Sequence, residues 1–110
     1  ALVMAPAIVQ AFDPPSLQQI DTETTFVLGA ADTVAPNATN GSVAARLVPN
    51  SRTRLVPGAV HYDFLGICTE AGRSTLPFCA LQAEADAAHR AAIDEGLELF
   101  GRTLGPPSRR

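Results

Sequence analysis

The 110-residue sequence contains no lysine, and its eight arginines are outnumbered by eleven acidic residues, which gives a net charge of −3. Apart from Arg109 and Arg110, no basic residues cluster, so nucleic-acid binding has little electrostatic support. No apolar run approaches the roughly 18 residues that a membrane-spanning helix requires. The sequence also lacks internal repeats and low-complexity stretches.

The residues that are present are typical of a folded domain. Hydrophobic residues make up 46% of the sequence and charged residues 17%, a balance that favours a globular fold over disorder. A chain of this length forms about one small domain with a modest core. Residues 1–7 lack a charged start and are interrupted by Pro6, so they predict a strand rather than a signal peptide. The chain does not begin with methionine, and we expect it to be a piece of a longer polypeptide.

Three strand-like runs cover residues 1–5, 24–28 and 52–56, and proline or glycine follows each of them. The segments between and after these runs have helical or loop character. Strands that alternate with helices predict an α/β fold with a parallel sheet covered on both faces. We expect one domain portion over residues 1–104 and a flexible tail over residues 105–110.

Two segments have the spacing of apolar residues that predicts a helix. The first lies within residues 37–48, where Pro49 is the stop and the N-cap is Asn37, Thr39 or Asn40. The second lies within residues 82–104, where one helical face carries Ile93, Leu97, Phe100 and Leu104.

One polar residue follows each of the second and third predicted strands. Asp32 follows the second strand, in TTFVLGAADTVAP, and His61 follows the third, in LVPGAVHYDFLG. Because functional groups gather at the carboxyl ends of parallel strands, adjacent strands would bring these two residues side by side. A carboxylate beside an imidazole fixes its tautomer and leaves the other ring nitrogen free to act as a base. The pattern therefore indicates an acid–base pair.

The stretch VLGAADTVAP, followed by PGAVHYDFLG, resembles the C-terminal part of α/β-hydrolases. The similarity is closest to the dienelactone-hydrolase-like and platelet-activating-factor-acetylhydrolase-like bacterial esterases, in which the chain order is nucleophile, acid, histidine. The resemblance implies about three parallel strands flanked by helices, with Asp32 as triad acid and His61 as triad base. It also implies a small-molecule ester substrate and no cofactor. We expect Tyr62 and Phe64 to wall the pocket, although packing in the core would explain these two residues equally well.

The nucleophile elbow of that family, G-x-S-x-G or G-x-C-x-G, is missing from this sequence. None of the five serines lies in that pattern, and the nearest imitation, GICTE at residues 66–70, follows the histidine and ends in Glu70 instead of glycine. The family's oxyanion-hole segment also lies earlier in the fold. We therefore expect the chain to be inactive by itself. Its expected partner is the missing N-terminal hydrolase segment or, through an exposed sheet edge, a second copy.

Other interpretations of the same residues remain open. Asp32 suits an Asx-turn, His61 a satisfied loop histidine, Asp63 a turn or cap, and His89 a solvated helix face. No ligand motif supports a metal site built from these four residues. The alternative function is a non-catalytic binding or assembly module that retains the hydrolase fold. A nucleotide-binding domain is disfavoured because no G-x-G-x-x-G follows a strand.

The two cysteines, Cys68 and Cys79, flank a stretch with too little apolar periodicity to be held by packing alone. A disulfide between them would close a short loop and stabilise it by roughly 2–3 kcal/mol in the chain-entropy treatment. It would also indicate an oxidising compartment, and hence a periplasmic or secreted protein. Two reduced, partly buried thiols are the alternative.

Overall fold

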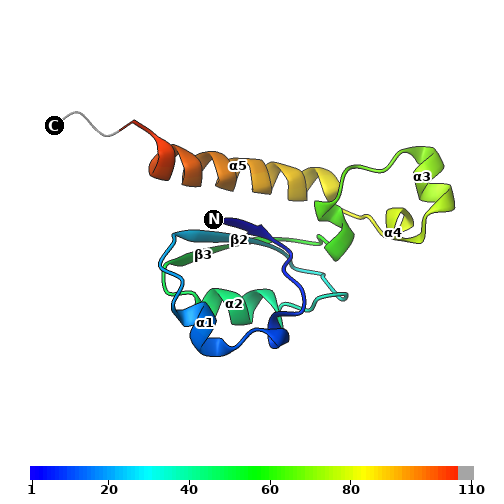
Figure 1. Ribbon diagram of the computed structural model, residues 1–110. Coiled ribbons are helices and arrows are strands. Elements are labelled where there is room, and N and C mark those ends of the chain that lie inside the picture. Colours follow the sequence, from blue (N-terminus) through cyan, green and yellow to red (C-terminus); the bar gives the residue numbers. More distant parts are fainter. Residues whose placement is uncertain (107–110) are drawn as a thin grey trace.

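The computed structural model describes residues 1–106 and contains a three-stranded parallel sheet with helices on both faces (Figure 1). The strands are β1 (Leu2–Met4), β2 (Thr24–Gly29) and β3 (Ser51–Val56), in the spatial order β1-β2-β3. The predicted α/β class, with about three parallel strands flanked by helices, is confirmed. Of the predicted tail at 105–110, residues 107–110 lie outside the described part.

The helices form a layer on each side of the sheet and an extension beyond it (Figure 1). One face carries η1 (Val9–Ala11), α1 (Pro14–Gln18) and α2 (Gly41–Leu47). The long helix α5 (Ala85–Leu104) covers the other face. Between β3 and α5 the chain forms η2 (His61–Phe64), α3 (Glu70–Thr75) and α4 (Pro77–Ala80).

Both predicted helices are present: α2 follows Asn40, one of the three predicted N-cap residues, and α5 begins at Ala85, within the predicted segment 82–104. α2 starts after Asn40, which occupies the N-cap without a side-chain capping bond. Its side-chain oxygen instead accepts the backbone N–H of Val9 at 3.2 Å, so a tertiary contact has replaced the local one. α2 ends at Leu47, before Pro49, as predicted.

The central strand β2 organises the core, because all six of its residues are buried. Phe26 and Leu28 pack with Ala44 and other residues on the α1–α2 side, whereas Val27 packs with Ala88 and other residues on the α5 side. The alternation of strand side chains between two faces therefore supplies both layers from a single strand. A parallel strand buried on both sides explains the nearly continuous apolar run in this part of the sequence.

Helix α5 approaches the sheet through its small residues rather than through its large apolar ones. A Cβ atom on Gly96 would lie 3.3 Å from Leu2 Cδ2, so glycine permits close packing there. The buried residues of α5 are Ala85, Ala88, Ala91, Gly96 and Leu99. The apolar face predicted from the sequence stays exposed, with exposed fractions of 59%, 71%, 43% and 77% at Ile93, Leu97, Phe100 and Leu104. Periodicity identified this face correctly but could not show that it would remain uncovered.

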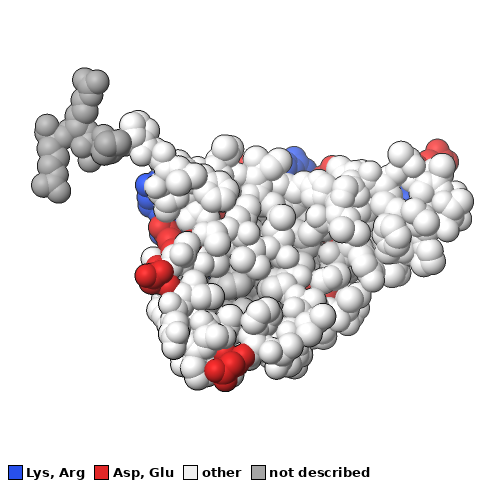
Figure 2. All heavy atoms as spheres, in the orientation of Figure 1, with Lys and Arg blue, Asp and Glu red and all other residues white. Residues whose placement is uncertain are grey.

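The strand β1 forms a free edge of the sheet, and an apolar groove borders it on each face. The groove on the α5 side has a volume of about 650 Å³ and is lined by Leu2, Met4, Leu97 and Phe100, among others. The groove on the opposite side has a volume of about 510 Å³ and includes Val3. Figure 2 shows that uncharged residues form the central part of the face drawn there.

Candidate active site

The carboxyl ends of β2 and β3 bring Asp32 and His61 together. The two strands pair in parallel, with Gly29 opposite Val56. Immediately beyond that pairing, Nδ1 of His61 lies 2.8 Å from Oδ2 of Asp32. Because the carboxylate can only accept, Nδ1 carries the proton and donates it to the hydrogen bond. The Asp32 side chain is 1% exposed and that of His61 is 21% exposed, so the acid is sealed in and the imidazole remains accessible.

The two loops approach one another closely because glycine ends β2. A Cβ atom on Gly29 would lie 2.5 Å from the carbonyl oxygen of Ala59, a distance that no larger residue tolerates without movement. The same carbonyl accepts the backbone N–H of Ala31 at 2.9 Å, and the Val56 carbonyl accepts that of Ala30 at 3.0 Å. These bonds extend the pairing of β2 and β3 into the loops, which fixes the distance between the acid and the histidine.

The other carboxylate oxygen of Asp32 forms an Asx-turn. Oδ1 accepts the backbone N–H groups of Val34 at 3.0 Å and Ala35 at 2.8 Å. The turn expected from the sequence and the contact with His61 therefore coexist, one on each oxygen. Since both oxygens are occupied, the carboxylate cannot rotate away from the imidazole without losing a hydrogen bond.

A cavity of about 230 Å³ lies beside His61 and is bordered by Met4 and Ala5 from the end of β1. Tyr62, Phe64 and Leu65 complete its wall. Among the described residues, no group forms a hydrogen bond with the second imidazole nitrogen, Nε2. Nε2 of His61 is therefore free to accept a proton, and the His61 side chain borders this cavity at the edge of the sheet.

Asp63 does not take part in the Asp32–His61 pair. Its side chain is completely buried, and its carboxylate accepts backbone N–H groups from Val60, Ala83 and Glu84. The sequence predicted a turn or cap residue at this position. The structure agrees for the local turn and adds bonds to the two residues that precede α5, which the sequence could not reveal.

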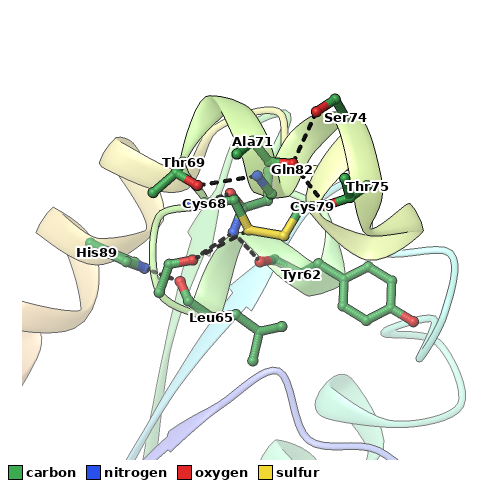
Figure 3. The surroundings of a disulfide bond; sticks show 12 residues. Tyr62, Leu65, Cys68, Thr69, Ala71, Ser74, Thr75, Cys79, Gln82 and His89 are labelled. Atoms are coloured by element: carbon green, nitrogen blue, oxygen red, sulfur yellow. Dashed lines mark hydrogen bonds between the residues drawn. A yellow bond between two sulfur atoms is a disulfide. The ribbon is translucent and has the colours of Figure 1, made fainter.

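Cys68 and Cys79 form a disulfide with a Cα–Cα distance of 5.7 Å, which confirms the predicted pairing and leaves no thiol at Cys68 to act as a nucleophile (Figure 3). Within residues 1–106, no three His, Cys, Asp or Glu side chains converge in a way that could hold a metal ion. The same part of the chain has no helix both long and apolar enough to cross a bilayer.

Two further residues near the site, Gln82 and His89, form contacts that no sequence pattern predicted. Gln82 is buried and bonds to Tyr62, Gly66 and Cys68 through its side-chain amide. His89 was expected on a solvated face, but its Nε2 donates to the Leu65 carbonyl at 2.6 Å. Neither residue lies in a recognisable motif, because both contacts join segments that are far apart in the sequence.

Comparisons with known proteins leave the family of this chain unassigned. No protein-family description matches the sequence, and no curated protein matches it either. Among solved structures, a bromoperoxidase from Bacillus anthracis is similar to 81% of this chain, with a TM-score of 0.48 and 19% sequence identity. The chain spans about a quarter (24%) of the length of that protein. A likeness this distant does not assign a family.

Proposed function

We propose that residues 1–104 are the C-terminal part of a serine-type α/β-hydrolase domain and contribute the acid and the base of an ester-hydrolysing triad. The observation that supports this most directly is the 2.8 Å hydrogen bond between Asp32 and His61 at the carboxyl ends of adjacent parallel strands. The burial of the acid and the accessibility of the imidazole are what a general base with an orienting carboxylate requires.

In this role Nε2 of His61 takes the proton of a serine hydroxyl supplied by another part of the domain. The serine oxygen attacks the ester carbonyl, and His61 then returns the proton to the leaving alcohol. In the second half of the reaction His61 activates water, which releases the acid and frees the serine. Asp32 holds the imidazole in the tautomer with Nδ1 protonated and stabilises the imidazolium that forms at each step.

The nucleophile and the oxyanion donors are proposed to come from a preceding segment of the same polypeptide. The free edge of β1 supports this arrangement, because a further strand paired with β1 would end beside Met4 and Ala5. These two residues border the cavity at His61. Apolar grooves on both sides of β1 suit helices that would cover the enlarged sheet.

The finer assignment, to the dienelactone-hydrolase-like or platelet-activating-factor-acetylhydrolase-like esterases, rests on the two sequence stretches around Asp32 and His61. The substrate class under this assignment is a small-molecule ester. The disulfide between Cys68 and Cys79 supports export to an oxidising compartment, the periplasm or the cell exterior.

The alternative function is a non-catalytic assembly module that keeps the fold. The observation that favours it is the same uncovered edge, because a free strand between apolar grooves also suits association with a second copy. The two functions differ in what restoring the upstream segment does: it creates an activated serine in the first case and none in the second.

The experiment compares residues 1–110 with a chain extended by the residues encoded upstream of Ala1. A fluorophosphonate probe, which labels activated serines covalently, should label the extended chain and leave the isolated one unlabelled. In the extended chain, Asp32→Asn should reduce kcat for ester hydrolysis by roughly 10³–10⁴-fold because the histidine tautomer is lost. The matched control is Asp86→Asn, the same change at an exposed position in α5. Stoichiometric labelling of a serine in the isolated chain, or none in the extended chain, would contradict the proposal.

A further inference from the structure

The short turn that carries His61 is fastened to the start of α5 by three side chains, Asp63, Gln82 and His89. We call these three residues the His61 clamp. The turn itself, η2, has only four residues, and among the described residues the sole hydrogen bond of the His61 ring is the one to Asp32. The backbone of the turn must therefore be held from outside if the imidazole is to stay in place.

Asp63 forms the centre of the clamp. Its Oδ2 accepts the N–H of Val60 at 2.7 Å and that of Glu84 at 3.0 Å, while its Oδ1 accepts the N–H of Ala83 at 2.8 Å. One carboxylate thus joins the residue before His61 to the two residues that immediately precede α5. The carboxylate also lies close to the N-terminal end of that 20-residue helix, whose positive partial charge favours an acidic side chain.

Burying the Asp63 carboxylate costs free energy of desolvation, so burial by itself does not favour an aspartate at this position. Asp63 is 0% exposed. Among the described residues, no arginine or histidine lies within ion-pair distance of it. A buried charge without a counter-charge carries a large desolvation cost, which backbone N–H donors must offset. What the arrangement provides is a fixed geometry: three backbone N–H donors converge on one carboxylate and hold the two chain segments at a set distance.

Gln82 and His89 hold the other end of the turn (Figure 3). Nε2 of Gln82 donates to the carbonyl oxygens of Tyr62 and Gly66, both at 3.0 Å. His89 reaches from the second turn of α5 and donates to the Leu65 carbonyl at 2.6 Å.

The clamp also continues into the disulfide loop. Oε1 of Gln82 accepts the N–H of Cys68 at 3.1 Å. The same side-chain amide therefore binds both η2 and the first cysteine of the disulfide. As a result, backbone groups on both sides of His61, from residue 60 to residue 66, are bonded to side chains of the clamp.

We infer that the His61 clamp is a set of positioning residues that keeps the imidazole within bonding distance of Asp32. Its contribution to catalysis rests on the proposed hydrolase function, whereas its effect on the imidazole is a property of this chain alone. Among the described residues, none of the three side chains forms a hydrogen bond with the His61 ring, so each acts through the backbone of the turn. Removing a clamp residue should loosen the Nδ1–Oδ2 hydrogen bond while the sheet remains folded.

The test is nuclear magnetic resonance of the 110-residue chain with ¹⁵N-labelled histidine, following the Nδ1–H proton of His61. Asp32→Asn assigns the resonance, because it removes the charged acceptor. Asp63→Asn keeps the shape of the side chain but turns an NH₂ group toward backbone donors. It should shift the resonance and raise its exchange with solvent at least about tenfold, as expected for local opening. Asp86→Asn, with the same charge change at an exposed site in the first turn of α5, should leave both unchanged.

A second variant keeps the test decisive if Asp63→Asn does not fold. His89→Phe removes only the bond to Leu65 from a partly exposed position, and it should move the His61 resonance in the same direction by a smaller amount. Unchanged resonance and exchange in folded variants, with only a lower melting temperature, would overturn the inference. Unfolding of both variants would overturn it as well. A loosened imidazole together with an unlabelled extended chain would instead support the clamp and refute the hydrolase proposal.

Discussion

The two edge strands of the sheet carry opposite kinds of side chain, charged on β3 and apolar on β1. At the β3 edge, Arg52 forms an ion pair with Glu98 at 2.9 Å, and Arg54 forms one with Glu95 at 3.3 Å. At the β1 edge, the side chains are Leu2, Val3 and Met4, and apolar grooves lie on both sides. A charged strand protects its unpaired backbone from other strands, whereas an apolar strand invites them.

The two edges differ in how well their side chains suit contact with water. The charged side chains of β3 and their partners on α5 suit permanent exposure. The β1 edge and the exposed stripe of α5 place apolar residues where a protein partner would cover them. Under the proposed function, β3 would remain an edge and β1 would become an inner strand of a larger sheet.

The largest expected effect on stability comes from comparing a residue of the central strand β2 with one of the exposed apolar face of α5. Leu28→Ala should lower the free energy of unfolding by about 2–5 kcal/mol, because Leu28 is 1% exposed and its loss leaves a cavity. Leu97→Ala should change it by no more than about 0.5 kcal/mol, because Leu97 is 71% exposed. Urea denaturation measures both. If both variants lost the same free energy of unfolding, the apolar face of α5 would be buried in solution, which would contradict the contrast drawn between the two edges.

The loop closed by the Cys68–Cys79 disulfide can be compared with the two sheet edges, because a covalent bond stabilises it. The double variant Cys68→Ser with Cys79→Ser should lose roughly 2–3 kcal/mol of stability in the chain-entropy treatment. Thiol labelling of unreduced, denatured wild-type protein should find no free cysteine. Two titratable thiols would remove both this prediction and the inference of export.

Self-association is the direct test of the apolar edge. We expect the isolated chain to self-associate, and Leu97→Lys should weaken that association roughly tenfold or more by placing a charge in the groove. The matched control is Thr53→Lys, which adds the same charge to the exposed β3 edge and should have no such effect. Sedimentation velocity over a range of concentrations gives the result. A wild-type chain that stays monomeric at high concentration would count against a missing partner.

The smallest expected effect is the pH response of an ion pair that ties α5 to the segment before β2. The hydrogen bond from Arg102 lowers the pKa of Glu23 below its usual value of 4.5. A lowered folded-state pKa contributes stability above the unfolded-state pKa, and that contribution is lost as the pH falls through the folded-state pKa. Glu23→Gln should therefore reduce stability slightly at pH 7 and not at pH 3, by urea denaturation. Glu70→Gln, at an exposed position without an ion pair in the described chain, should show no such difference.

Local patterns predicted the elements of this fold well. The runs at 24–28 and 52–56 became β2 and β3 within one residue at each end, because β-branched and apolar runs bounded by glycine or proline leave few alternatives. Asn40, one of the three N-cap residues expected for α2, does occupy the N-cap. Its side chain, however, bonds to Val9 instead of capping the helix, a contact between segments 31 residues apart.

Local patterns were enough to predict a parallel α/β fold and to place Asp32 and His61 just past two strand ends, because hydrophobic periodicity defines the type and the ends of each element. That β2 and β3 are neighbours, so that the two residues meet, is a result of tertiary pairing. Tertiary packing is also what makes α5 approach the sheet through alanine and glycine and leaves its large apolar face uncovered. The His61 clamp is likewise a product of tertiary contacts. Helical periodicity defines a face without naming its partner, and a carboxylate, an amide and an imidazole that bind backbone groups form no pattern in the sequence. The contacts that hold the site join distant segments, and folding alone brings those together.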